Sequence, residues 1–283
     1  RSLFARNQIS YNFSENHKVA LSLAPTYSYR TSDDLLVAGE ADPALADNYL
    51  TDFVSGLEYT GDFASKQLQT IVFAKNYIQN IRIETFAPDL DQTLIDERQV
   101  NNYGAGTAIR YNWSPRFNTK ISYEFAYRLP RQDEIFGDGL QILENLELEP
   151  ENSHNFNLQW SLNSDIKSET YWKFEGNFFL RQIDNLIFFS LVFEDFGVFE
   201  NVWSANSQGI ELAGNVKNLL PGLNLAANAT YQAYVNTSDT GIFERFNGDR
   251  IPNVPYLFAN VNADYTFDQV FNENDNLNIF WNS

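Results

Sequence analysis

The sequence contains no cysteine and no methionine, and its only histidines are His17 and His154. Without cysteine the chain has no disulfide framework, no thiolate metal site and no cysteine nucleophile. The two histidines have no metal-ligand spacing, and neither is flanked by a nucleophile motif such as G-x-S-x-G. We therefore predict that the chain is not an enzyme and that it uses no metal and no other cofactor.

The sequence also lacks an initiator methionine and any apolar run long enough for a transmembrane helix. Because residue 1 is an arginine, we expect the chain to be an internal piece of a longer protein. The missing apolar run would by itself favour a soluble protein. In a membrane-crossing strand, however, only alternate residues face lipid, so a mean hydropathy of -0.37 is compatible with crossing.

Positive charge is scarce: 19 Lys and Arg stand against 37 Asp and Glu, for a net charge of -18. Nucleic acid and a bare anionic bilayer both need a basic surface, so neither is expected as a partner. We interpret the acidic loops as solvated, and binding of divalent cations or a cationic ligand stays open without EF-hand spacing. These loop acids are Asp33, Asp34, Glu40, Asp42, Asp47, Asp89, Asp91, Asp96, Glu97, Asp133, Glu134 and Asp138.

What the sequence does have is alternation, in about twelve long stretches that read as two-faced β-strands. In 223–235 the odd positions are apolar, from Leu223 to Val235, whereas amides and hydroxyls such as Asn228 and Thr230 lie between them. Successive side chains of a strand point to opposite faces, so one face is apolar and the other polar. The same pattern recurs in 19–30, 155–162, 168–182 and 257–267.

Strand length separates a membrane barrel from a soluble sandwich, which would alternate too. The stretches run about 12–16 residues, against about 5–6 for soluble strands and about 9–11 for a bilayer crossing. Short and long connections alternate along the chain, and aromatic residues gather near strand ends, as in a barrel with an interfacial girdle. We predict an all-β fold, an antiparallel up-and-down transmembrane β-barrel that is partial, with about twelve strands.

No linker-like segment divides the chain, so residues 1–283 are expected to belong to a single outer-membrane barrel domain. The last predicted strand begins near Leu277 and stops at Ser283, which is too short for a crossing. We therefore expect the piece to fall short of a closed barrel, because a strand wall in hydrocarbon leaves no unpaired edge.

The long connections are predicted near 31–48, 84–98, 130–152, 183–207 and 237–252, and loops of that length usually carry function. The connection 183–207 is rich in aromatic residues such as Phe188, Phe193 and Phe199. Such a surface fits either a ligand-contacting hairpin or, as the favoured interpretation, an extension of the barrel wall above the membrane.

Three segments carry a family resemblance. Residues 127–130 (Y-R-L-P), followed by 133–138 (D-E-I-F-G-D) and 145–153 (N-L-E-L-E-P-E-N-S), resemble the "F-R-x-P … E-L-x-G-D … N-P-x-L-x-P-E-x-S" stretch of TonB-dependent outer-membrane receptors. Residues 208–212 (Q-G-I-E-L) and 251–255 (I-P-N-V-P) are similar to two later strand-entry motifs of that family. The motifs occur in the family's order, at loop-to-strand junctions, and the similarity spans residues 118–267.

The resemblance implies a barrel of about 22 strands with an N-terminal plug, of which this chain would cover roughly strands eight to nineteen. The plug, the early strands and the last strands would then be absent from it. The implied function is active import of a scarce nutrient, with a ferric siderophore favoured, across the outer membrane of a Gram-negative bacterium. The implied partners are outer-membrane lipid, the imported small molecule, the inner-membrane TonB complex acting through the plug, and a surface lipoprotein.

Two departures from the family pattern bear on the cargo. Asn145 is followed by Leu146 where the family often has proline. Haem receptors typically carry a histidine between the first two motifs, and none occurs between Pro130 and Asn145, so haem import is disfavoured. Cobalamin, oligosaccharide and peptide remain open beside the siderophore.

The motif residues are expected to be structural. Arg128 lies on the polar face of its strand with Ser122 and Glu124, so it should point into the lumen, where a carboxylate such as Glu211 could pair with it. An ion pair that braces the wall or holds the plug is favoured over direct ligand contact. The residues of this group are Arg128, Pro130, Glu134, Asn145, Leu148, Pro150, Glu151, Gly209, Glu211, Pro252, Asn253 and Pro255.

Candidate substrate contacts are polar residues of the long connection 130–152, namely Arg131, Gln132, Asp133 and Asp138, because rim loops are where specificity resides. Two rival functions share many of these features. A passive porin or hydrophobic-substrate channel would have the barrel without a plug, and a soluble secreted β-rich protein would be adhesive or structural.

Overall fold

The structure of the chain is a computed structural model that describes residues 1–32, 46–87, 92–138, 140–193, 195–240, 243–252, 254–272 and 275–283. Several residues singled out from the sequence lie outside the described residues. They are Asp33, Asp34, Glu40, Asp42, Asp89, Asp91 and Asn253.

Nearly all of the regular structure is β-strand. The strands are β1 (Ser2–Phe4), β2 (Asn7–Ser14), β3 (His17–Ser32), β4 (Ala46–Phe63), β5 (Leu68–Ala87), β6 (Gln92–Ser114), β7 (Phe117–Arg128), β8 (Ile142–Leu143), β9 (Glu151–Asn163), β10 (Tyr171–Phe193), β11 (Phe196–Lys217), β12 (Leu223–Asn236), β13 (Leu257–Asp268) and β14 (Asn276–Asn282). Two short helices, α1 (Gln132–Phe136) and the 3-10 turn η2 (Glu244–Phe246), complete the described elements. Neither helix in this part of the chain is long and apolar enough to cross a membrane.

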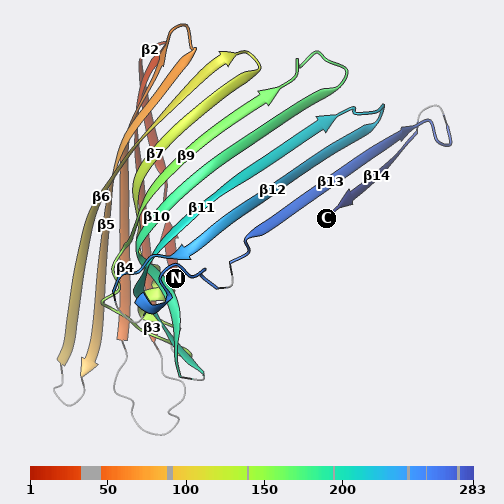
Figure 1. Cartoon of the computed structure of the whole chain (residues 1–283). Helices are drawn as coiled ribbons and strands as arrows, with labels where there is room; N and C mark the ends of the chain where they lie inside the picture. Colours follow the sequence, from red (N-terminus) through yellow and green to blue (C-terminus); the bar gives the residue numbers. More distant parts are fainter. Residues whose placement is uncertain are drawn as a thin grey trace.

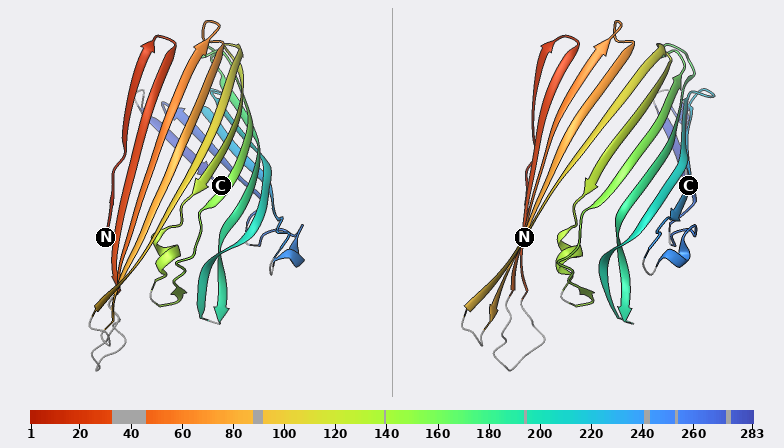
Figure 2. Two further views of the ribbon diagram at one scale, coloured as in Figure 1. Left: turned by 90° about the vertical axis from the view of Figure 1, so that its left-hand side faces the viewer. Right: turned by 60° about the vertical axis from the view of Figure 1, so that its left-hand side comes forward.

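The strands form one 14-stranded sheet in which neighbours in sequence pair antiparallel, in the order β3, β4, β5, β6, β7, β9 to β14. At one end β1 and β2 both pair with β3, and the two-residue β8 adds a parallel pairing to β11. Figure 1 shows the strands running side by side and tilted, with the short turns at one rim and the longer connections at the other. Figure 2 shows the sheet curving like part of a barrel wall. The predicted fold class, a partial up-and-down β-barrel, is confirmed.

Two of the predicted long loops are largely strand. The segment 84–98 lies in β5 and β6, apart from the few residues between Ala87 and Gln92. The segment 183–207 continues the pairing of β10 with β11, with register shifts between Ile183 and Ile187 and between Leu191 and Phe193. The segment 84–98 is predicted as a loop from the sequence because the outward face of the extended β5–β6 hairpin is charged rather than apolar. On that face Arg82 Nη1 lies 2.9 Å from Glu97 Oε1. The aromatic segment 183–207 therefore extends the wall, which was the favoured of its two interpretations.

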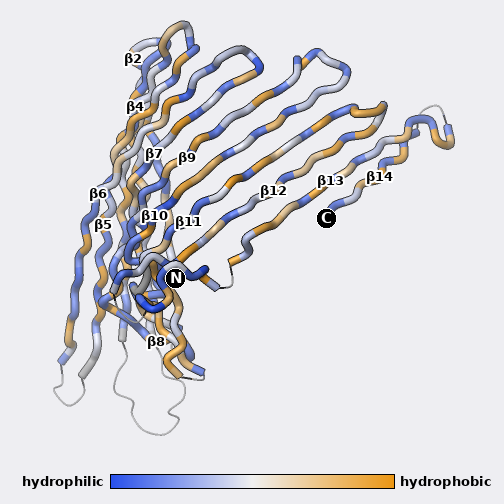
Figure 3. The backbone as a smooth tube through the Cα atoms, viewed as in Figure 1, coloured by the Kyte–Doolittle hydropathy of each residue, from blue (hydrophilic) through white to orange (hydrophobic). Residues whose placement is uncertain are grey.

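The two faces of the sheet are inverted relative to a soluble protein. Register pairs place Ile121, Leu158, Phe178, Ile210, Tyr231 and Leu257 at one level on one face, across β7 to β13. These side chains are exposed; Leu257 is 56% accessible, and on the same face Phe174 is 43% accessible. Figure 3 shows the same alternation of apolar and polar residues along the strands. A wall that exposes its apolar face is what a hydrocarbon surround requires.

The polar face is the concave one. The connection between β7 and β9 contacts both β4–β5 and β10–β11, which are separated in the sheet by β6, β7 and β9. A single segment reaches both only from the concave side. There Ile135, Phe136 and Leu148 of this connection pack with Leu50 of β4, Ile81 and Ile83 of β5 and Ile187 of β10, forming the main buried core.

Candidate functional site

The connection between β7 and β9, residues 129–150, forms a strap across the concave face at the rim of the long loops. Its first part is α1, whose start is stabilised by Glu134: the Arg131 N–H donates to Glu134 Oε2 at 2.8 Å. The helix ends at Gly137, which has φ of 62° and whose added Cβ would collide with the Ile142 carbonyl. Only glycine fits this position, and the chain then turns back through β8.

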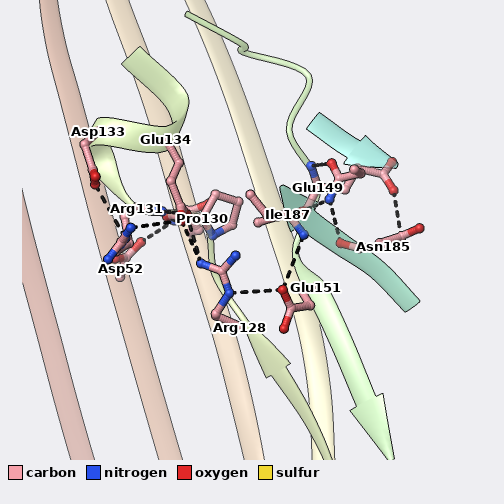
Figure 4. Close-up of polar contacts among 12 residues, drawn as sticks. Asp52, Arg128, Pro130, Arg131, Asp133, Glu134, Glu149, Glu151, Asn185 and Ile187 are labelled. Atoms are coloured by element: carbon pink, nitrogen blue, oxygen red, sulfur yellow. Dashed lines mark hydrogen bonds and ion pairs between the residues drawn. The ribbon is translucent and has the colours of Figure 1, made fainter. Parts of the chain in front are cut away.

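Arg128 and two carboxylates hold the base of the strap. Arg128 Nη1 lies 2.9 Å from Glu134 Oε2, and Arg128 Nε lies 3.2 Å from Glu151 Oε2. Glu134 is buried, with its side chain 4% accessible, and also pairs with Arg131 Nη2 at 3.2 Å. Figure 4 shows Arg128 between the two acids. The partners of Arg128 are therefore Glu134 and Glu151. Glu211 is not among them; it accepts a hydrogen bond from Asn177 Nδ2 at 3.0 Å.

One side of the strap is fastened to β3, β5 and β6. Arg98 Nη1 donates to the carbonyls of Leu146 at 2.7 Å and Leu148 at 3.2 Å, and Arg30 donates to the Gly137 carbonyl. The fully buried Gln79 donates from Nε2 to the Pro130 carbonyl at 2.9 Å and to Asp52 Oδ1 at 2.8 Å. These bonds satisfy backbone carbonyls that would otherwise be buried without donors.

The other side of the strap is fastened to the β10–β11 hairpin. Ile142 and Leu143 pair in parallel with Gly197 and Val198 of β11. Asn145 Nδ2 donates to the Phe199 carbonyl at 2.8 Å. The Asn201 side chain accepts from Glu149 N–H at 2.6 Å and donates to the Glu149 carbonyl at 2.9 Å. The strap is thus held at both ends by polar contacts and in the middle by the apolar core.

The four candidate contact residues all lie on the strap. Arg131 is the N-cap of α1 and Asp133 lies in its first turn; both are largely exposed, with Arg131 Nε 3.5 Å from Asp133 Oδ1, and Gln132 between them is half-buried. Asp138 lies at the other end of α1, where its Oδ1 accepts the N–H groups of Leu140, Gln141 and Ile142, each at 2.8 Å. These backbone donors, that of Ile142 first, hold the pKa of Asp138 below its ordinary value. The structure therefore brings Arg131, Gln132 and Asp133 together, whereas Asp138 stabilises the turn that follows α1.

The remaining motif residues have mainly structural contacts. Pro130, Pro150 and Leu148 are buried. At Gly209 an added Cβ would meet the Tyr231 carbonyl and the Phe179 ring, so this glycine permits a close approach, and no bulge occurs there. The Pro255 carbonyl accepts from Gln232 Nε2 at 2.9 Å, and Pro252 follows the buried Ile251. Asn253 lies outside the described residues.

Sequence reasoning missed the residues that receive the strap: Arg30, Gln79, Arg98 and Asn201. Each comes from a strand remote in sequence from its partner, with Gln79 and Pro130 separated by 51 positions. Strand parity could have placed Arg98 and Gln79 on the polar face, but their partner depends on how the strap folds back, which no local pattern specifies.

Comparison with known proteins agrees with this architecture. The family model "TonB dependent receptor-like, beta-barrel" matches residues 95–283, more than half of the chain. No curated protein matches the sequence.

Several solved structures share the fold. The copper transporter OprC superimposes with a TM-score of 0.70 at 14% identity, over 99% of this chain and 46% of its own. The ferric yersiniabactin uptake receptor FyuA from Yersinia pestis gives 0.61 at 12%, over 95% and 41%. The hemophore receptor HasR of Serratia marcescens gives 0.63 at 11%, over 99% and 50%. The chain thus spans half or less of the length of these structures. By its sequence match and its strand topology, the chain belongs to the TonB-dependent receptor β-barrel family.

Proposed function

We propose that this chain is part of an active importer in the outer membrane of a Gram-negative bacterium, which takes up a scarce nutrient with energy delivered through TonB. The observation that carries the proposal is the family match, which includes the strap and its polar rim. The inverted faces of the sheet support a membrane setting, because the exposed apolar side chains of β7 to β13 need a hydrocarbon surround.

A ferric siderophore is the cargo we favour. Among the structural neighbours, FyuA takes up ferric yersiniabactin and FauA is the alcaligin receptor. The rim offers the chemistry that a polar chelate needs: the exposed Arg131 cation, the Gln132 amide and the Asp133 carboxylate at the start of one short helix. Because the strap is fastened on both sides, these groups are held in place before a ligand arrives, which lowers the entropic cost of binding.

The wider mechanism is binding followed by opening of a path. In this proposal the strap and the neighbouring loops capture the ligand at the outer rim. A plug elsewhere in the full-length protein closes the lumen, and force from the TonB complex displaces it. A surface lipoprotein could assist capture from outside. The chain's own contribution is the wall, the rim and the fixed strap, and no bond in the cargo is broken.

Growth of a deletion strain on defined iron, vitamin and glycan sources tests the proposal. We expect a defect on one or more ferric siderophores, restored by the wild-type gene. Complementation with Arg131→Ala should restore growth only at raised siderophore concentration, whereas Lys167→Ala, on the opposite rim, should restore it fully. Unchanged growth on every source would argue against import. Growth lost only on a vitamin or glycan would keep the importer and reject the siderophore.

Two rivals give different results in the same strain. A passive porin would continue to work in a strain without TonB, whereas the importer would not. A soluble secreted protein would be recovered from cells without detergent, and that outcome would reject the proposal that the chain is part of an outer-membrane barrel.

A further inference from the structure

One polar row crosses the concave face between the strap and the rim of the short turns. Its members share one register level on β4 to β12. In order along the sheet they are Asp62, Gln69, Arg110, Lys120, Gln159, Asn177, Glu211 and Thr230. The ends of the row are internally bonded: Gln69 Nε2 donates to Asp62 Oδ1 at 2.9 Å, and Asn177 Nδ2 donates to Glu211 at 3.0 Å.

The centre of the row holds two cations side by side. Arg110 of β6 and Lys120 of β7 are direct cross-strand partners. Directly opposed side chains have Cβ atoms about 4.5–5.5 Å apart, and like charges in that position destabilise a sheet. Within the described ranges neither cation has an ion pair. This contrasts with Lys75 on the same face, which lies 2.6 Å from Glu124 Oε1.

A hollow lies in front of these cations. It has a volume of about 680 Å³, and its lining includes Arg110, Lys120, Asn118 and Gln159. Lys173, Glu175 and Glu211 also line it. Lys173 pairs with Glu175 at 2.8 Å, and Glu211 accepts a hydrogen bond from the neutral Asn177 amide, so two unpaired cations face one carboxylate. The part of the hollow around Arg110 and Lys120 is therefore left with a surplus of positive charge, beside amides that can donate hydrogen bonds.

We propose that Arg110 and Lys120 form an anion site that holds a carboxylate group on the inner wall. A carboxylate would accept charge-assisted hydrogen bonds from both cations and would remove their mutual repulsion. The size of the hollow lies within the range of small-molecule sites. The carboxylate belongs either to a free solute or to an acidic side chain of the full-length protein that lies within the lumen. The site is separate from the strap and does not depend on the identity of the cargo.

Charge reversal at Lys120 distinguishes a filled site from an empty one. In an empty site, Lys120→Glu would place a carboxylate opposite Arg110 and replace repulsion by attraction, so the melting temperature of the purified full-length protein in detergent would rise. In a filled site the new carboxylate displaces the bound one, and we expect the melting temperature to fall. A rise would exclude an internal carboxylate but not a free solute, because a site for a free solute is empty in the purified protein. A rise together with no binding of citrate would overturn the proposal.

Citrate identifies the source of the carboxylate. For a free solute, calorimetry should show that citrate binds the wild-type protein and that Arg110→Gln or Lys120→Gln weakens binding at least tenfold. Lys18→Gln, another cation on the concave face near the rim of the short turns, should leave binding unchanged. For an internal side chain, citrate should not bind, and Lys120→Gln should lower the melting temperature more than Lys18→Gln does. If citrate does not bind and the two variants melt alike, the proposal fails.

Discussion

Glu134 shows how one buried carboxylate can organise a rim. It receives the Arg128 guanidinium, the Arg131 guanidinium and the Arg131 backbone N–H, all within 3.2 Å. A charge as buried as this one needs such partners, because desolvation without them would cost several kcal/mol. Glu134 therefore couples the end of β7 to the start of α1. The exposed Arg131 side chain depends on it for its position, although no substrate contact has to involve Glu134 itself.

Replacing Glu134 with glutamine should loosen the strap. The Glu134→Gln variant keeps the volume but loses the charge that both arginines face, so we expect a loss of about 1–3 kcal/mol in the free energy of unfolding. Urea unfolding of the full-length protein, followed by tryptophan fluorescence, measures this difference. The neighbouring Asp133→Asn is the matched control, since Asp133 is 59% accessible and its ion pair with Arg131 is weak. Equal stability of the two variants would contradict the role given to Glu134.

At the scale of elements, the alternation of the sequence was sufficient to predict the strands. Odd and even positions of 223–235 separate cleanly, and β12 runs from Leu223 to Asn236. It was insufficient in β6, where Asp96, Glu97, Arg98 and Gln99 make both faces polar and no alternation can be seen. Alternation was also insufficient to predict the partners of Arg128. Glu211 lies on the same polar face, but Arg128 is on β7 and Glu211 on β11, and β9 and β10 lie between these strands.

The turn of the strap at Asp138 should be sensitive to acid. Its pKa is lowered by backbone donors, so its contribution to stability is present above its ordinary value of 3.8 and is lost as the pH falls through the lower, folded value. We expect amide protection at Leu140, Gln141 and Ile142 to decrease below about pH 4. Hydrogen exchange over a pH series, corrected for intrinsic rates, measures this.

The Asp138→Asn variant tests the cause of that acid sensitivity. It should show reduced protection in the strap already at neutral pH, with little further change in acid. Asp165 is the matched control, because it forms a similar turn at the opposite rim, accepting from Lys167 N–H at 3.0 Å and pairing with Arg116 at 2.8 Å. Asp165→Asn should leave the strap protected. Full protection of 140–142 in Asp138→Asn would contradict the explanation.

For the whole molecule, the central question is which face meets hydrocarbon. Leu158 and Asn157 are adjacent in the middle of β9 and point to opposite faces. Leu158 belongs to the exposed apolar row, where burial against lipid stabilises the wall. Asn157 lies on the concave face, opposite Ser122 of β7. The two residues share strand and depth and lie on opposite faces, so a substitution at each one reports on the surroundings of its own face.

An arginine at each position therefore separates the two arrangements. If the apolar face meets lipid, Leu158→Arg should cost about 2–4 kcal/mol at mid-membrane depth, whereas Asn157→Arg should be tolerated on a water-facing wall. The measurement is the folded fraction of the full-length protein in lipid vesicles along a urea series. In a soluble sandwich the apolar row would be the dry core and no vesicle would be needed for folding. Folding of the wild type without lipid or detergent, or equal tolerance of both arginines, would therefore reject the membrane wall on which the proposed import rests.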